Sequence, residues 1–285
     1  MSANATEPLQ VVPRERYAEL VTVLMHQLPG SLKVIGHLKS NQKSEKWIMC
    51  VYVDSWPDPC VVLVVDNIYE GVRSANMDVI FHAVDNEKLR SVLSSTKVLQ
   101  WQKTISFKGI ESSFLPVLDE IKPKGSVLKE EIRADVHICE NGEKLHKGLL
   151  PDGYRISPLK KSDIDSVMKV WKFGSGRLRE RFLLQVATHF SAGIYSEETG
   201  NLVSWAIQMY FGAIGSVNTL ELHRHRGLAK SVISFVAQKM LQCGEIPWAH
   251  VEDVQTKDVS QHMVTSLGFK KSSIQHVWLI CNPVK

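Results

Sequence analysis

The pattern of hydrophobic and polar positions in the second half of the chain predicts a regular succession of strands and helices. Short runs rich in Val, Ile and Leu indicate strands, whereas apolar residues three or four positions apart indicate the buried face of a helix. The predicted order is β-α-α-β-β-β-α-β-α-β. The predicted strands are 154–157, 192–195, 202–209, 214–222, 246–251 and 277–281, and the predicted helices are 162–171, 178–187, 228–241 and 259–267.

Turn and cap signals set the ends of these elements. Ser162-x-x-Asp165 approximates a capping box and predicts the start of the first helix. Glu198-Thr199-Gly200-Asn201 predicts a hairpin turn, and Gly268-Phe269 predicts the C-terminal cap of the last helix. In that last helix, Val259, Met263 and Leu267 are predicted to share one face.

The first half is less regular, and its pattern predicts a separate domain. Helical periodicity runs from Tyr17 to Leu28 and ends at Pro29-Gly30. The chain turns polar and glycine-rich between 141 and 153, so we place a domain boundary there and expect domains 1–150 and 151–285. The remaining predictions are β-like runs at 32–35, 47–53 and 60–65, and helices near 84–93 and 111–121.

Composition narrows the class of protein. A hydrophobic content of 44% and a charged content of 22% over 285 residues are typical of a globular protein. The net charge of +4, without a basic block, gives no reason to expect nucleic acid as a partner. No apolar run reaches the ~20 residues of a membrane helix. The first ten residues lack the apolar core of a secretory signal, and their acidic Glu7 gives no support for a cleaved mitochondrial one.

Cysteine and histidine usage gives no sign of a disulfide framework or a metal site. The five cysteines are scattered without a C-x-x-C pair, which favours a reducing compartment. The eleven histidines lack the H-E-x-x-H spacing of a zinc helix, so we expect no metal.

The segment Arg224-His225-Arg226-Gly227-Leu228-Ala229 carries the candidate chemistry. It connects a predicted strand to a predicted helix, whose first turn offers free backbone N–H groups and the positive end of the dipole to an anion. A Cβ at Gly227 would crowd an approaching phosphate, and small Ala229 permits similar closeness. A structural corner with an exposed arginine is the alternative interpretation of this segment.

Several strings together resemble one family. The spacing Arg-x-x-Gly-x-Ala and the predicted element order resemble the GNAT acyltransferase superfamily, which binds coenzyme A at this turn. Other strings resemble the glycine N-acyltransferases and their like proteins. They are Leu28-Pro29-x-Ser31-Leu32-Lys33-Val34-x-Gly36, Val53-Asp54-Ser55-Trp56-Pro57-Asp58, Trp171-x-Phe173-Gly174 with Arg181-Phe182, Val203-Ser204-Trp205, and Thr219-Leu220.

The resemblance implies two tandem GNAT-like α/β domains, the first degenerate and the second binding acyl-CoA on a splayed mixed sheet. It implies acyl transfer from acyl-CoA, as co-substrate without a prosthetic group, to the amino group of glycine or a similar small amino acid. A monomer is expected, in mitochondria by family resemblance or otherwise in the cytoplasm. The implied coenzyme A-binding residues are Val217, Thr219, Leu220, Leu222, Arg224, Arg226, Gly227, Leu228, Ala229 and Lys230.

The chain departs from the family pattern at two reactive positions. Where glycine N-acyltransferase carries its general-base glutamate, this chain has Ala213, and the GNAT tyrosine that protonates the thiolate is replaced by Val264. The candidate bases are His250 and Glu252, which alternation puts on one face of their strand. Histidine has the better pKa for the task, and a core histidine bonded to the backbone is the alternative interpretation of His250. Asp253 and Glu221 are further candidates.

A carboxylate-bearing acceptor requires a cation. Arg177, Arg179 and Arg181 cluster on the second predicted helix, and helical spacing puts the first and third on one face. The alternative is a solvated helix face. Two rival functions stay open: an acyltransferase for a larger amine or a protein lysine, and an acyl-CoA-binding protein that has lost catalysis.

Overall fold

The structure is a computed structural model that describes residues 6–46, 48–66, 76–145, 150–170, 176–253 and 257–284. It divides into two compact units, the first Met1–Asp135 with Ser273–Lys285 and the second Val136–Ser272. By this division the expected boundary at 150/151 lies inside the second unit. Strands β6 (Leu128–Ile138) and β12 (Lys270–Cys281) contribute residues to both units, because each is a long strand. Among the described residues, no helix is long and apolar enough to cross a membrane.

The first unit has the strand order β1-β2-β3-β4-β5-β12, with β4 and β5 parallel. Its strands are β1 (Gln10–Val11), β2 (Met49–Val53), β3 (Val61–Asp66), β4 (Asn76–Ala83) and β5 (Thr104–Glu111). Its helices are α1 (Tyr17–Leu24), α2 (Leu32–Lys43), α3 (Asn86–Ser95) and α4 (Leu115–Ile121), with short 3-10 turns at Arg14–Arg16, Met25–Gln27 and Ser112–Phe114.

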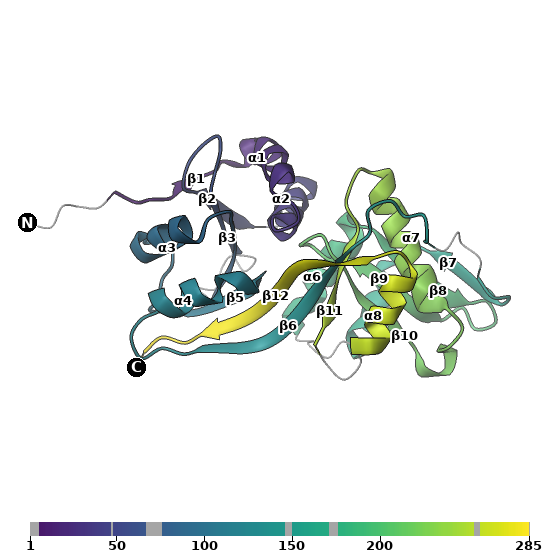
Figure 1. Ribbon diagram of the computed structural model, residues 1–285. Helices are drawn as coiled ribbons and strands as arrows, with labels where there is room; N and C mark the ends of the chain where they lie inside the picture. The colour runs from purple at the N-terminus through teal and green to yellow at the C-terminus, as the bar shows by residue number, and fades with distance from the viewer. Residues whose placement is uncertain are drawn as a thin grey trace, which may run out of the picture. The chain divides into compact units, whose positions relative to one another are not determined.

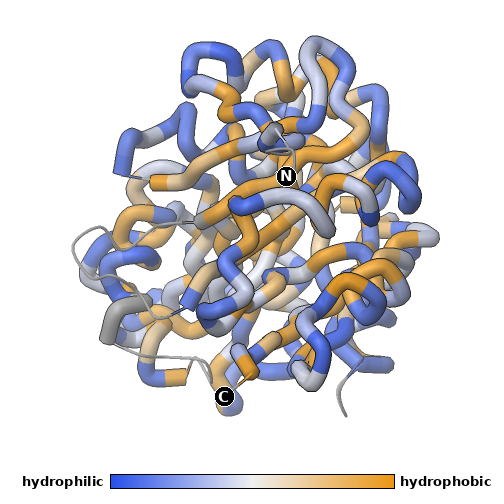
Figure 2. The backbone as a smooth tube through the Cα atoms, turned by 90° about the vertical axis from the view of Figure 1, so that its left-hand side faces the viewer, coloured by the Kyte–Doolittle hydropathy of each residue, from blue (hydrophilic) through white to orange (hydrophobic). Residues whose placement is uncertain are grey.

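Alternation along β3 explains how helices cover both faces of this sheet (Figure 1). Val61, Leu63 and Val65 pack in one core cluster with α3 and α4, whereas Val62 and Val64 pack in another with α1 and α2. Because both faces are buried, the strand is an unbroken apolar run in the sequence. In Figure 2, hydrophobic segments (orange) gather toward the middle of the tube and hydrophilic ones (blue) lie mostly at its outside.

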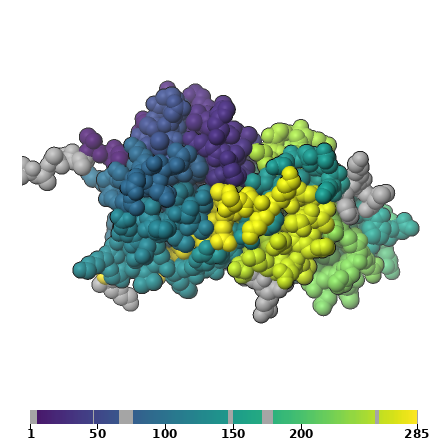
Figure 3. All heavy atoms as spheres, viewed as in Figure 1, coloured from purple at the N-terminus to yellow at the C-terminus, as the bar shows by residue number. Residues whose placement is uncertain are grey.

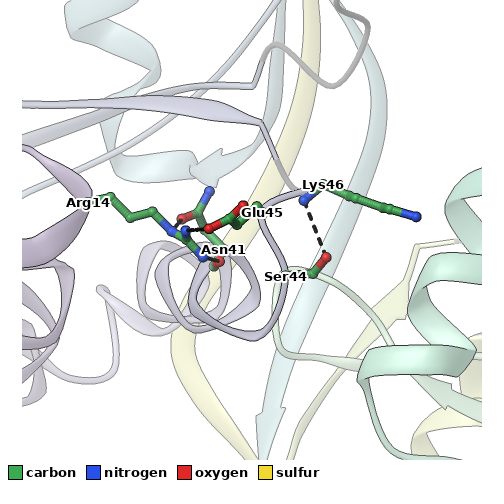
Figure 4. A network of polar contacts seen from close by, with 5 residues as sticks. All are labelled: Arg14, Asn41, Ser44, Glu45 and Lys46. Atoms are coloured by element: carbon green, nitrogen blue, oxygen red, sulfur yellow. Dashed lines mark hydrogen bonds and ion pairs between the residues drawn. The ribbon is translucent and has the colours of Figure 1, made fainter.

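The prediction of a strand at 32–35 is wrong, because these residues begin helix α2. Val34, Ile35 and Leu38 are buried together at helical spacing, a pattern that a four-residue window cannot distinguish from a strand. Arg14 holds the far end of this helix, donating to the Asn41 side chain (2.9 Å) and backbone oxygen (2.8 Å) and pairing with Glu45 (Figure 4). Strands β4, β5 and β6 were not predicted.

The elements from residue 154 onward follow the predicted order, although the predicted last strand, 277–281, pairs with β5 and belongs to the first unit. The strand order of the second unit is β6-β11-β10-β9-β8-β7. The strands are β7 (Tyr154–Ser157), β8 (Ser191–Ser196), β9 (Leu202–Gln208), β10 (Ile214–Thr219) and β11 (Trp248–Glu252). The helices are α5 (Ile164–Val170), α6 (Gly176–Thr188), α7 (Leu228–Gln242) and α8 (Lys257–Ser266), with 3-10 turns at Lys161–Asp163 and Glu221–His223. One core cluster contains residues of α7 and α8, and another contains residues of α5 and α6.

The predicted hairpin turn at Gly200 and the predicted helix cap at Gly268 are both confirmed. Gly200 has a φ of 71° in the hairpin turn, and Gly268 has a φ of 87°. The backbone N–H of Phe269 donates to the oxygen of Val264 over 3.1 Å, as in a glycine-capped helix end.

Two predicted details of the second unit need correction. The first cap is formed by Asp163 rather than Asp165, because the Asp163 carboxylate accepts the Lys160 N–H over 2.7 Å. Val259 does not share the buried face of α8 but is 73% exposed, and α8 lies at the surface in Figure 3 (yellow-green). Its apolar face is instead anchored by buried Val264.

The first unit repeats the order of the second. The elements β1, α1, α2, β2, β3, β4, α3, β5, α4 and β6 give the same β-α-α-β-β-β-α-β-α-β succession. In both units the fourth and fifth strands, β4 with β5 and β10 with β11, are parallel and joined through a helix.

Candidate functional site

The predicted anion site lies in the turn between β10 and α7. Gly227 is the N-cap of α7 in a left-handed conformation with a φ of 78°. Leu228, only 1% exposed, anchors the helix start in the core. The first helical bond runs from the Ser231 N–H to the Gly227 oxygen (3.2 Å), so the N–H groups of residues 228–230 precede it. Such groups bind a phosphate at the positive end of a helix dipole.

Cationic side chains lie around this turn. Arg224 is exposed and donates to the Thr219 backbone oxygen over 3.2 Å. The Tyr154 hydroxyl connects two further groups, lying 2.9 Å from His223 Nδ1 and 3.0 Å from the Arg226 guanidinium. The arrangement gives an anion both backbone donors and positive charge.

The strand leading to the turn is shorter than predicted. β10 ends at Thr219, so Leu222 lies in the 3-10 turn and is 85% exposed. Glu221, in the same turn, is exposed and does not end a strand. Backbone addition of an extended ligand to this strand can therefore use Val217 and Thr219 but not Leu222.

Strands β10 and β11 part almost at once. Their one paired position is Ile214 with Ala249. On its other side β10 stays paired with β9, although the register shifts between Gly215 and Asn218. Within that shift lies Ser216, which has a φ of 50° and is 6% exposed. The sequence analysis did not single out Ser216, and alternation alone gives no signal for it.

His250 lies on β11 beside this opening. It is half-buried, and its ring lies 4.9 Å from the Trp248 ring and 5.8 Å from the Phe211 ring, centroid to centroid. Glu252, two residues along the same strand, is also half-buried. Asp253 pairs with Lys257 over 3.2 Å, which engages it one turn before α8.

The two positions that depart from the family pattern are both buried. Ala213 is 1% exposed and its carbonyl oxygen accepts the Met209 N–H over 2.7 Å. Val264, a residue of α8, is 4% exposed and packs in the core cluster that this helix shares with α7. Neither side chain can exchange a proton.

Two arginines of α6, Arg179 and Arg181, make separate contacts. Arg179 pairs with exposed Asp165 through contacts of 2.7 and 3.2 Å. The Arg181 guanidinium lies 3.5 Å from the centroid of the Tyr210 ring, in a cation–π contact. Gln185, one turn further along α6, accepts the Tyr210 N–H over 2.9 Å and so fixes this aromatic residue against the helix. The side chain of Arg177, like the segment Trp171 to Gly174, lies outside the described residues.

No group of three or more histidine, cysteine or carboxylate side chains with the geometry of a metal site occurs among the residues that the structure describes.

Solved structures identify the fold. The chain matches the X-ray structure of a Drosophila protein with a TM-score of 0.78 at 15% identity, covering 97% of this chain and 99% of that one. It matches a tandem GNAT protein from the clavulanic acid biosynthesis pathway with a TM-score of 0.61 at 12% identity, covering 97% and 99%. The fold is therefore a GNAT-type fold.

Sequence relatives identify the family. The family model described as aralkyl acyl-CoA:amino acid N-acyltransferase matches residues 13–191, and the FR47-like protein model matches residues 191–279. Human glycine N-acyltransferase-like protein 2 is 25% identical over 92% of this chain and 94% of its own length. Bovine glycine N-acyltransferase is 23% identical over 86% and 89%. The chain belongs to the aralkyl acyl-CoA:amino acid N-acyltransferase family.

Proposed function

We propose that this protein transfers an acyl group from acyl-CoA to the amino group of glycine or a similar small amino acid. The observation that carries the proposal is the turn at Gly227, a left-handed helix N-cap with arginines beside it at the end of a strand that leaves its neighbour. This arrangement suits the pyrophosphate of acyl-CoA, and the free part of β10 suits its extended pantetheine arm.

In the proposed reaction the acceptor nitrogen bonds to the thioester carbonyl carbon, the C–S bond breaks, and the sulfur leaves with its electron pair. The proton that the amine loses passes to a base or through water to the departing sulfur. His250 is the proposed base, since histidine titrates near neutral pH and its half-buried ring lies beside the opening. The absence of a tyrosine at Val264 should lower the reaction rate little. A thiol has a pKa of roughly 8.5, so the thiolate is a good leaving group without an acid.

Arg181 is the proposed partner of the acceptor carboxylate. Stacking on Tyr210 holds one face of its planar guanidinium, and the N–H groups at the edge of such a plane match the two oxygens of a carboxylate. Arg179 is less suited, because Asp165 already engages it. A carboxylate contact of this kind favours a free amino acid over a protein lysine.

The test is product formation, followed by mass spectrometry, from a panel of acyl-CoA donors with the amino acids, simple amines and lysine peptides. We expect acylglycine or another small acylamino acid. Coenzyme A binding without any product would instead support the binding protein that has lost catalysis, the rival that Ala213 and Val264 motivate.

Variants of the two neighbouring arginines test the acceptor contact. Arg181→Ala should raise the KM for glycine by about 10- to 150-fold, equivalent to about 1.5–3 kcal/mol for a charged hydrogen bond. The KM for acyl-CoA should not change. With glycinamide as the acceptor, which has no carboxylate, the variant should have nearly the activity of wild type. The matched control is Arg179→Ala, on the same helix, for which the glycine KM should stay at the wild-type value.

The compartment stays a prediction: mitochondrial by family resemblance, otherwise cytoplasmic, to be decided by fractionation of cells that express the full chain.

A further inference from the structure

The hydroxyl of Ser216 is buried without a hydrogen-bond partner among the residues that the structure describes. The residue is 6% exposed, and its Oγ accepts no hydrogen bond from these residues and donates none to them. Most buried polar groups in folded proteins are paired, because an unmet group costs stability. An isolated buried hydroxyl therefore indicates that something other than stability selects a serine here.

The backbone of Ser216 adds a second cost. Its φ of 50° is in the left-handed region, which residues with a side chain rarely adopt. Such strain is retained where the surrounding structure enforces it, and it clusters at active sites and ligand clamps. Ser204 on the adjacent strand differs, since its hydroxyl lies 3.0 Å from the Asn218 backbone oxygen and 2.8 Å from Thr219 Oγ1. The two serines thus separate a satisfied hydroxyl from an unsatisfied one in the same part of the sheet.

The position of Ser216 connects its unpaired hydroxyl and its left-handed backbone to the proposed reaction. It lies two residues beyond Ile214, the position at which β10 is still paired with β11. The following residue, Val217, carries a backbone N–H on the part of β10 beyond its one paired position with β11. A left-handed residue turns successive N–H groups toward one side and makes a concavity for an anion. The side-chain oxygen of a serine and the N–H of the next residue are close enough in the chain to reach one oxygen atom.

We propose that Ser216 Oγ donates a hydrogen bond to the carbonyl oxygen of the bound thioester, beside the Val217 N–H. This inference rests on the proposed acyl transfer. When the acceptor nitrogen bonds to the carbonyl carbon, the carbonyl electron pair moves onto this oxygen, and it returns when the thiolate leaves with the C–S pair. The hydroxyl keeps its proton throughout and stabilises the charge that the oxygen gains, as preorganised donors in a dry site do.

Ser216→Ala removes the donor and the unmet hydroxyl together. The kcat should fall by about 10²–10³-fold, the usual effect of losing one oxyanion donor, while calorimetry should give unchanged acyl-CoA affinity. The Tm should not fall, because no hydrogen bond is lost. Ser216→Gly, which also accepts the positive φ, should raise the Tm and lower kcat in the same way. Ser204→Ala is the matched control, and its Tm should fall because it removes the hydrogen bonds of this hydroxyl with the Asn218 backbone oxygen and with Thr219 Oγ1.

Infrared spectroscopy separates this inference from the proposed function. With a ¹³C-labelled thioester carbonyl, wild type should lower the C=O stretch relative to water-exposed acyl-CoA, and Ser216→Ala should raise it again, whether or not an acceptor is present. If wild type acylates no amine but the stretch shifts in this way, the proposed function fails and the role of Ser216 stands. If wild type makes acylglycine while Ser216→Ala changes neither kcat nor the stretch, the role of Ser216 is overturned and the function stands.

Discussion

The two units follow the same order of strands and helices but differ at the turn after the fourth strand. In the second unit this turn begins α7 at Gly227, which is left-handed and exposed, with arginines nearby. In the first unit the matching turn begins α3 at Asp85, whose carboxylate accepts the Lys88 N–H over 2.6 Å. An acidic cap takes up a helix N–H group and repels a phosphate. The same local architecture therefore supports anion binding in one unit and a stable helix start in the other.

The units differ again where the parallel strands part. In the first unit β4 and β5 stay paired over four positions, from Asn76–Thr104 to Val79–Phe107. Beyond them Gly109 has no room for a side chain, since a Cβ would lie 2.0 Å from Lys33 Nζ and 2.8 Å from the Trp278 ring. In the second unit β10 and β11 pair once, and the residues beside the opening, such as His250, are partly exposed.

The element order thus fixes the scaffold, whereas a few residues decide whether a site opens in it. Lys33 lies over the Trp278 ring at 4.3 Å, and burial together with nearby Lys108 holds its pKa well below the usual range. Burial and the nearby Lys33 likewise lower the pKa of His276. In the first unit, side chains therefore fill the region beyond the paired part of the parallel strands. In the second unit this region is open.

The largest effect is expected from Gly227→Val. A side chain here would crowd the phosphate, so acyl-CoA affinity should fall by about a hundredfold or more, equivalent to about 3 kcal/mol, as measured by calorimetry. No atom of the described residues lies within 4 Å of a Cβ placed at Gly227 or at Gly244, and the φ values of these glycines are 78° and 69°. Gly244→Val therefore imposes similar backbone strain at the other end of α7. If both variants bind acyl-CoA equally, the turn has only a structural role.

The next prediction concerns the pH dependence of stability in the first unit. Burial lowers the pKa of His82, in the first unit, from 6.5 to about 4. The unfolded chain therefore takes up a proton before the folded chain does, and stability falls as the pH drops from 6.5 toward 4. The loss assigned to His82 is roughly 3 kcal/mol. His82→Gln keeps a donor for Gln27, which lies 3.1 Å from the ring, and should flatten this part of the stability profile in urea titrations. An unchanged pH dependence in the variant would contradict the assignment.

Arg224→Ala should weaken acyl-CoA binding by about 1.5–3 kcal/mol through the loss of a charged hydrogen bond. The effect should appear in the KM for acyl-CoA and not in the KM for the acceptor, and it should shrink at high salt because the residue is exposed. Equal effects on both Michaelis constants would show a general disturbance of the site instead.

The smallest effect is expected in the first unit. Asp85→Ala removes the cap of α3 and should lower the free energy of unfolding by about 1 kcal/mol. Urea denaturation measures this change, and the acyl-CoA affinity should equal that of wild type. Weaker acyl-CoA binding in this variant would contradict the assignment of Asp85 to helix stability alone.

Most of the second unit could be predicted from sequence because its signals are local. The glycines at 200, 227 and 268 mark turns and caps by their left-handed backbone, and α7 has the bounds that its periodicity indicates within one residue. The first unit was harder to predict from sequence. Its strands β4 and β5 are defined by strands distant in the chain, and the buried polar residues of α2 weaken the hydrophobic periodicity of that helix.

The site was only partly predictable for a related reason. Arg224 and Gly227 act through local backbone geometry, which spacing reveals. The stacking of Arg181 on Tyr210 joins a helix to a distant turn, and the unmet hydroxyl of Ser216 depends on a register shift between strands. Neither feature leaves a periodic trace in a single sequence.

The stoichiometry of acyl-CoA binding, measured by calorimetry on the full chain with a non-reactive acyl-CoA thioether, tests the central comparison most directly. We expect one site per chain, which is lost in Gly227→Val and kept in Gly244→Val. Two sites per chain would show that the first unit also binds coenzyme A, and one site that survives Gly227→Val would show that binding does not depend on this turn. Either result would contradict the division of roles between the units.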